Sequence, residues 1–111
     1  MISREGKKLL TDIIECIASI DDHLESKRNF EEYTANKTKR RAVERELEII
    51  GEAMSKLLKL YPEINISYAR LIVDLRNKVI HAYDSVDDIV IWKIVIKDLP
   101  ILEEEAKNLL A

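Results

Sequence analysis

The chain has 111 residues, of which 47% are hydrophobic, and its formal net charge is −3. This length predicts a single domain over residues 1–111, and the hydrophobic content excludes a disordered chain. The mild negative charge excludes nucleic-acid binding through bulk positive charge, so any RNA contact must come from a local patch.

Only two glycines and two prolines are available for turns, which favours long helices over a many-stranded sheet. No stretch reaches the ~18 consecutive apolar residues of a membrane span, and no signal peptide is recognisable. We therefore expect a cytoplasmic protein with no membrane partner. Cys16 is the single cysteine, so an internal disulfide and a cysteine-based metal site are excluded, and we expect Cys16 to be structural.

The first predicted helix runs from about Arg4 to Lys27, because its apolar residues recur at helical spacing. They are Leu9, Leu10, Ile13, Ile14, Ile17, Ile20 and Leu24. Asn29 can cap a short helical turn over Phe30 to Tyr33. The polar stretch from Thr34 to Thr38 is expected to be the break before the next helix.

His23 stands late in the first helix, directly after Asp21 and Asp22. We interpret it as part of the surface electrostatics. A metal site made of these three residues is the alternative, but adjacent helical residues diverge by about 100° and seldom converge on one ion.

The second long helix is predicted from about Thr38 to Tyr61, where Pro62 ends it. Its core stripe is Val43, Leu47, Ile50, Met54, Leu57 and Tyr61, with Leu58 beside it. Asn65 or Ser67 can then cap a third long helix that reaches about His81 or Ala82.

The last region, Val86 to Leu110, is ambiguous. Ile89 to Ile96 has the composition of a strand, but no other segment could pair with it, so we predict a buried helix. Ser85 and Asp88 have capping-box spacing at its start. Pro100 should kink or restart the helix, with Asp98 as a possible new cap, and the final stripe consists of Leu102, Ala106 and Leu109. The fold class is therefore all-α: an antiparallel bundle of four long helices plus one short helix.

One helix face in the third segment could carry chemistry. The core face comprises Tyr68, Leu71, Ile72, Leu75 and Val79, and Arg70, Asp74, Asn77 and His81 lie on the opposite face. Asn77 and His81 are i, i+4 neighbours and can act on one ligand. A plain solvated helix surface is the alternative interpretation.

Several features favour a site over a plain surface. His81 is near a helix end and is the residue type that most often transfers protons near neutral pH. Arg76 has the forked guanidinium that suits a phosphate. Val73 and Ile80 add apolar surface beside the core stripe, as a contact between two copies would.

The segment Arg76-Asn77-Lys78-Val79-Ile80-His81-Ala82-Tyr83 matches the pattern Arg-x4-His-x-Tyr. With Ala42 to Ala53, which contains Ile-Ile-Gly-Glu-Ala, and with Val86-Asp87, Trp92 and Asp98-Leu99-Pro100, it resembles the HepT-like toxin family of the HEPN superfamily over nearly the whole chain. Arg-x4-His alone is a weak signal, and the other segments in order make it fairly specific.

The resemblance implies an all-helical homodimer in which two copies of the motif form one composite, metal-independent endoribonuclease site without a cofactor. In this family His81 would be the general acid or base, Arg76 would stabilise charge on the transition state, and Asn77 would orient the phosphate or His81. Arg76 and His81 are about 140° apart on an ideal helix, which suits a site shared between two copies or a distorted helix end.

The resemblance also implies a toxin–antitoxin pair. The expected partners are an RNA substrate, not DNA, and a minimal nucleotidyltransferase antitoxin that adds AMP to Tyr83. The alternative is a non-catalytic nucleotide-binding or interaction partner of a nucleotidyltransferase. A plain dimerisation module is a third possibility, which would leave Arg76, His81 and Tyr83 without a role.

Overall fold

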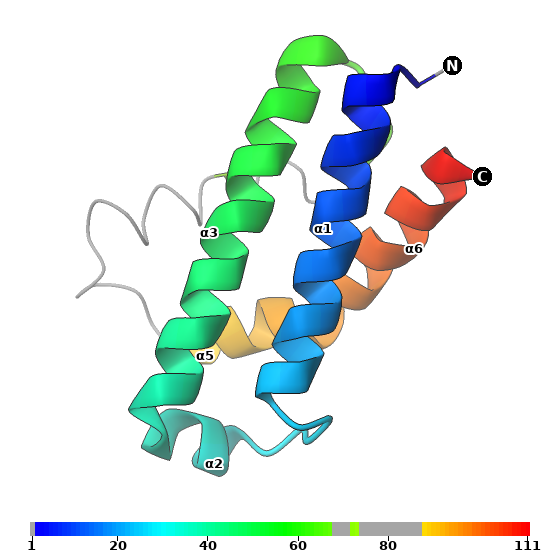
Figure 1. Ribbon diagram of the computed structural model, residues 1–111. Coiled ribbons are helices and arrows are strands. Elements are labelled where there is room, and N and C mark those ends of the chain that lie inside the picture. The colour runs from blue at the N-terminus through cyan, green and yellow to red at the C-terminus, as the bar shows by residue number, and fades with distance from the viewer. Residues whose placement is uncertain (1, 68–71, 74–87) are drawn as a thin grey trace.

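The computed structural model describes residues 2–67, 72–73 and 88–111, and within these residues the regular structure is entirely helical (Figure 1). The elements are α1 (Arg4–His23), α2 (Phe30–Ala35), α3 (Lys37–Leu60), α5 (Asp88–Lys93), the π-helical turn η2 (Ile94–Asp98) and α6 (Leu99–Leu110). The all-α, HEPN-like fold class is confirmed. The predicted third long helix, up to His81 or Ala82, falls mostly outside the described residues.

The helices form two layers. The long helices α1 and α3 lie side by side and antiparallel, and α5, η2 and α6 cross behind them, with α2 at the lower end of α3 (Figure 1). The predicted apolar stripes meet in the interior between these layers. The largest fully buried side chains are Leu10, Ile13, Ile20, Tyr33, Leu47, Ile50, Met54, Leu57, Ile72, Ile91, Leu99 and Leu102.

Asparagine caps begin two of the helices. The Asn29 side chain accepts a hydrogen bond of 3.0 Å from the Glu32 amide, which confirms the predicted cap of α2. The Asn36 side chain accepts one of 3.0 Å from the Lys39 amide and starts α3. The break predicted over Thr34 to Thr38 is therefore wrong in extent, because a single capping asparagine separates the two helices.

The first helix ends earlier than predicted, at His23 rather than at Lys27. Glu25 and Ser26 have φ values of 56° and 58°, a left-handed conformation that ends an α-helix. Asp21 holds this turn. Its backbone carbonyl accepts from the Ser26 amide, and its carboxylate accepts from the Ser26 hydroxyl at 3.0 Å and from Arg28 at 2.8 Å.

The C-terminal region is helical, as predicted, although Ile89 to Ile96 has strand-like composition. The prediction that Asp98 caps a new helix is wrong, because Asp98 is itself helical and its side chain makes no capping hydrogen bond. The chain instead passes through the wider turn η2, where the Leu99 amide donates to the carbonyl of Ile94, five residues earlier. Pro100 lacks an amide hydrogen and its ring clashes with an α-helical carbonyl four residues before it, so a π turn accommodates it without ending the helix.

We expect Asn36→Ala to lower the free energy of unfolding by about 1 kcal/mol. Asn36 caps α3, whose first turn carries no acidic residue to offset its basic side chains. Urea denaturation would measure the change, with Asn108→Ala on the exposed face of α6 as the matched control. Equal stability of the two variants would contradict the capping role.

Candidate functional site

The four residues of the motif, Arg76, Asn77, His81 and Tyr83, lie outside the described residues, so their joint role in one site stays a prediction. It does describe both sides of the motif. Ile72 is buried and Val73 is half-buried against the core. This agrees with the helix wheel, which places Ile72 in the core stripe and Val73 beside it. On the other side the described chain resumes at Asp88, the first residue of α5.

Asp88 is only five positions after Tyr83 in the sequence. Five residues of any conformation span at most about 18 Å. The surroundings of Asp88, like those of Val73 three positions before Arg76, are therefore tied closely to the motif, whatever path the intervening residues take.

An aromatic cluster holds α5 through Trp92, near the end of this short helix. The ring centroids of Trp92 and Tyr33 are 5.2 Å apart, and those of Trp92 and Phe30 are 5.8 Å apart with an interplanar angle of 59°. These distances are in the range that favours offset and tilted aromatic pairs. Trp92 thus packs α5 onto α2.

Charged groups from α3 lie next to this cluster. Burial, followed by the negative charge of Asp88, raises the pKa of Glu44, while Arg40 and Arg41 act in the opposite direction. Burial, Asp88 and Glu44 together raise the pKa of the Tyr33 hydroxyl. The negative charge of Asp88, on α5, therefore acts on Glu44, on α3.

No sequence pattern assigns a role to this arrangement. Asp88 is predicted only as part of a capping box with Ser85, which lies outside the described residues, and nothing in the sequence singles out Glu44. No local pattern links Glu44, on α3, with Asp88, which is 44 positions later in the chain. The tertiary packing alone brings them together.

His23 and Cys16 belong to a separate polar contact between α1 and α3. The Nε2 atom of His23 is 3.1 Å from the Oε2 atom of Glu46. Burial and the adjacent Glu46 carboxylate raise the pKa of Cys16 to about 11, so its thiol stays protonated and is a poor nucleophile. This agrees with a structural role for both residues.

A cleft of about 470 Å³ lies between the end of α1 and α6, where Asp21, Asp22, Arg28 and Glu103 contribute its polar groups. Asp21 is already bound by Arg28 and Ser26, and no histidine lines the cleft. The alternative metal site of Asp21, Asp22 and His23 is not supported. Among the residues that the structure describes, no group of three or more histidine, cysteine or acidic side chains is arranged to hold a metal ion.

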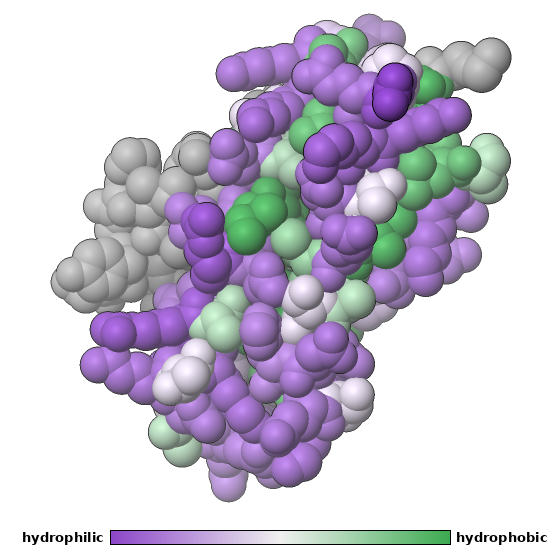
Figure 2. All heavy atoms as spheres, in the orientation of Figure 1, coloured by the Kyte–Doolittle hydropathy of each residue, from purple (hydrophilic) through white to green (hydrophobic). Residues whose placement is uncertain are grey.

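The visible face of the α1/α3 layer is mainly hydrophilic, and apolar side chains gather where the two helices meet (Figure 2). A shallow cleft of about 160 Å³ lies there, with Leu9, Ile49 and Ala53 between the charged Asp12 and Lys56. Of the helices in the described ranges, none has the length and apolar composition needed to cross a membrane.

The comparison with known protein families decides the family. A model of the family described as "Ribonuclease HepT-like" matches residues 13–109, which is most of the chain. The chain belongs to the HepT-like ribonuclease family. The match spans α1 to α6 and includes the motif from Arg76 to Tyr83, in agreement with the resemblance found in the sequence.

Two relatives of this HepT-like chain cover nearly its whole length. "Putative RNase MJ1380" of Methanocaldococcus jannaschii is 38% identical over 111 residues, which are 96% of this chain and 98% of the relative. "Probable ribonuclease HepT" of Thermococcus cleftensis is 38% identical over 112 residues, 97% of this chain and 98% of the relative. No solved structure matches the chain.

The Tyr33 hydroxyl yields a prediction about stability. It is fully buried and has no hydrogen-bond partner in the described part of the chain, and an unsatisfied buried donor is costly. We expect Tyr33→Phe to raise the free energy of unfolding by about 1 kcal/mol. The matched control is Tyr61→Phe, which removes a hydroxyl that accepts from the Ser3 amide at 2.7 Å and should not stabilise. Destabilisation by Tyr33→Phe in chemical denaturation would contradict the prediction.

Proposed function

We propose that this chain is a cytoplasmic, metal-independent endoribonuclease toxin that acts as a homodimer with one composite active site. The observation that carries the proposal is the complete Arg76-x4-His81-x-Tyr83 motif in a chain that the HepT-like ribonuclease family model matches over residues 13–109. The names of the two relatives, which describe ribonucleases, point in the same direction.

The proposed reaction needs acid–base chemistry and charge stabilisation. His81 of one copy accepts the proton of a ribose 2′-hydroxyl, and the freed oxygen attacks the adjacent phosphorus. The bond from phosphorus to the 5′-oxygen breaks, and a second histidine, from the other copy, donates a proton to that oxygen. The products are a 2′,3′-cyclic phosphate and a free 5′-hydroxyl.

Arg76 and Asn77 act on the phosphate in this proposal. Two phosphate oxygens carry increasing charge as the 2′-oxygen adds, and a guanidinium beside them stabilises that charge. Asn77, one helical turn before His81, orients the phosphate or the imidazole by hydrogen bonding. The two histidines thus transfer the protons, Arg76 supplies the positive charge and Asn77 supplies hydrogen bonds.

The other histidine of the chain offers a natural control. His23 pairs with Glu46 in the contact between α1 and α3, and the proposed reaction does not use it. A loss of activity that is confined to His81 variants would therefore separate catalysis from the general effect of removing an imidazole.

We expect His81→Ala to lower RNA cleavage at least a hundredfold, because general acid–base catalysis contributes about 10²–10⁴. The unmodified dimer would be incubated with tRNA and mRNA in the presence of a chelator, and cleaved ends would be assayed for 2′,3′-cyclic phosphate. His23→Ala should retain cleavage close to that of the wild type. Identical behaviour of the wild type and His81→Ala would refute the proposal, and stable binding to a nucleotidyltransferase without cleavage would favour a non-catalytic partner.

Regulation is proposed to act through Tyr83. A minimal nucleotidyltransferase antitoxin would transfer AMP from ATP to the tyrosine oxygen and release pyrophosphate. The added phosphate places negative charge two residues from His81, where it would repel the RNA backbone and disturb the charge balance of the site.

We expect co-expression with such a nucleotidyltransferase to add the mass of one AMP group per chain and to suppress cleavage. Tyr83→Phe should carry no added mass, whereas Tyr61→Phe, at the C-terminal end of α3, should be modified like the wild type. Intact-mass spectrometry would measure both. Persistence of the added mass in Tyr83→Phe would assign the modification to another residue.

A further inference from the structure

The beginning of α3 is strongly basic. Its first residues read Lys37-Thr38-Lys39-Arg40-Arg41, and its first turn contains no acidic residue. Positive charges at a helix N-terminus oppose the helix dipole, so this arrangement disfavours the helix unless anions offset it. The chain as a whole is negative, with a formal charge of −3, which makes this basic segment exceptional.

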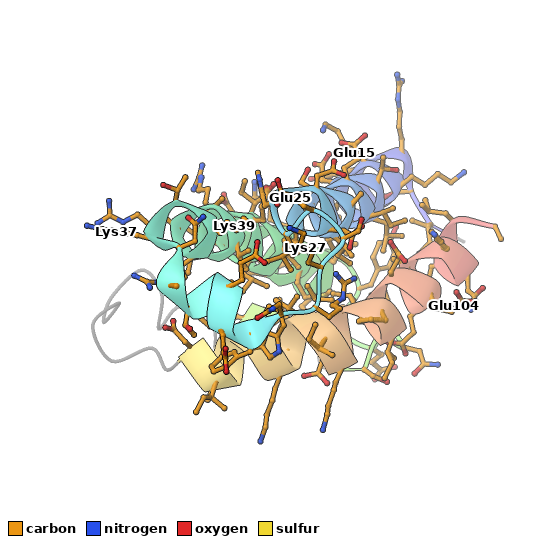
Figure 3. The ribbon with its side chains drawn as sticks, turned by 90° about the horizontal axis from the view of Figure 1, so that it is seen from below. Glu15, Glu25, Lys27, Lys37, Lys39 and Glu104 are labelled. Atoms are coloured by element: carbon orange, nitrogen blue, oxygen red, sulfur yellow. The ribbon has the colours of Figure 1, made fainter. Side chains whose placement is uncertain are left out.

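Two of the four cations have structural partners. Lys39 Nζ is 2.9 Å from the Glu32 carboxylate and 3.2 Å from that of Glu25, and Lys27 joins the same pair of carboxylates (Figure 3). Arg40 donates a hydrogen bond to the backbone carbonyl of Thr34. These two side chains tie the α1–α2 connection and α2 to α3, and they are not available to a ligand.

Lys37 and Arg41 are the remaining pair. Both are exposed, they are one helical turn apart, and neither forms an ion pair with any residue that the structure describes. Lys37 extends outward from the end of α3, away from the Lys39 cluster (Figure 3). Like charges at i, i+4 destabilise a helix slightly, so Lys37 and Arg41 do not stabilise α3 through each other.

The position of the pair connects it with the motif. The pKa of the partly buried Glu44 carboxylate is raised by burial and by the charge of Asp88, at the start of α5, and lowered by that of Arg41, on the same helix as Glu44. Asp88 in turn follows Tyr83 by five residues. Arg41, one helical turn after Lys37, and Asp88, at the start of α5, therefore act electrostatically on the same carboxylate.

We propose that Lys37 and Arg41 form a surface that binds the sugar–phosphate backbone of RNA outside the catalytic motif. This inference rests on the proposed ribonuclease function. The Cβ atoms of i, i+4 residues are about 5–6 Å apart, so two cations at this spacing can contact neighbouring phosphates of one strand. The surface contributes affinity without reading sequence, because phosphate contacts carry no base information.

The test replaces these two charges and two others of the same kind. Lys37→Gln/Arg41→Gln is compared with Arg4→Gln/Lys7→Gln, which removes two exposed cations from the first turn of α1 at the opposite end of the molecule (Figure 1). The affinity of each intact dimer for a fluorescent single-stranded RNA oligonucleotide is measured at several salt concentrations. The kcat and KM of RNA cleavage are measured in parallel.

We expect Lys37→Gln/Arg41→Gln to weaken RNA binding about fivefold to tenfold at low salt and to reduce the slope of log affinity against log salt by about 1.4, or 0.7 for each lost contact. The KM should rise while kcat stays within about twofold of the wild type. Arg4→Gln/Lys7→Gln should bind like the wild type. Unchanged binding by the first variant, or an equal loss in both variants, would overturn the proposal.

The two measurements separate this surface from the proposed function. RNA binding that depends on Lys37 and Arg41 in a protein that never cleaves RNA would support the surface and refute the ribonuclease proposal. If His81→Ala loses cleavage while Lys37→Gln/Arg41→Gln keeps both the cleavage rate and the KM of the wild type, the ribonuclease proposal is supported and the binding surface is refuted. Unchanged RNA affinity with weakened nucleotidyltransferase binding would assign the surface to a protein partner and overturn the RNA assignment.

Discussion

The antiparallel packing of α1 against α3 is the contact on which the rest of the structure depends. Leu10 and Ile13 from α1, and Leu47 and Ile50 from α3, are completely buried between the layers. Each such side chain contributes about 1.5–3 kcal/mol when it is fully buried, which is large beside the net stability of a small domain. The helix α3 contacts α2 at its N-terminus, and α2 in turn holds α5 through the aromatic contacts of Trp92.

Electrostatic interactions divide the charged residues into those that hold this frame and those that remain free. The contact of His23 with Glu46 joins α1 to α3, and Lys39 joins α3 to the preceding connection. The proposed reaction accordingly assigns proton transfer to His81 and gives His23 no role in catalysis. Lys37 and Arg41 are available to a ligand because they form no ion pair with the described residues, whereas Lys39 and Arg40 already have partners.

Much of the local structure could be predicted because its causes lie within a few residues of each other. Asn29 begins α2 through its own side chain, and Pro62 follows the end of α3 at Leu60 because proline cannot continue a helix. The helical period likewise placed Ile72 in the core. The motif from Arg76 to Tyr83 is also a local pattern, and with the long-helix segment it was enough to indicate the family that the comparison confirmed.

The amino-acid sequence by itself thus determined the helical class, the core stripes and the family, since each depends on periodicity or on short motifs. Only the structure showed where α1 ends, because the apolar period does not encode the left-handed turn at Glu25 and Ser26, which Asp21 holds through Ser26 and Arg28. It likewise decided that Pro100 follows a π turn without a capping Asp98, since the flanking helices stay packed on the core. The effect of Asp88 on the pKa of Glu44 has the same origin, because residues 44 positions apart come near each other only when the chain folds.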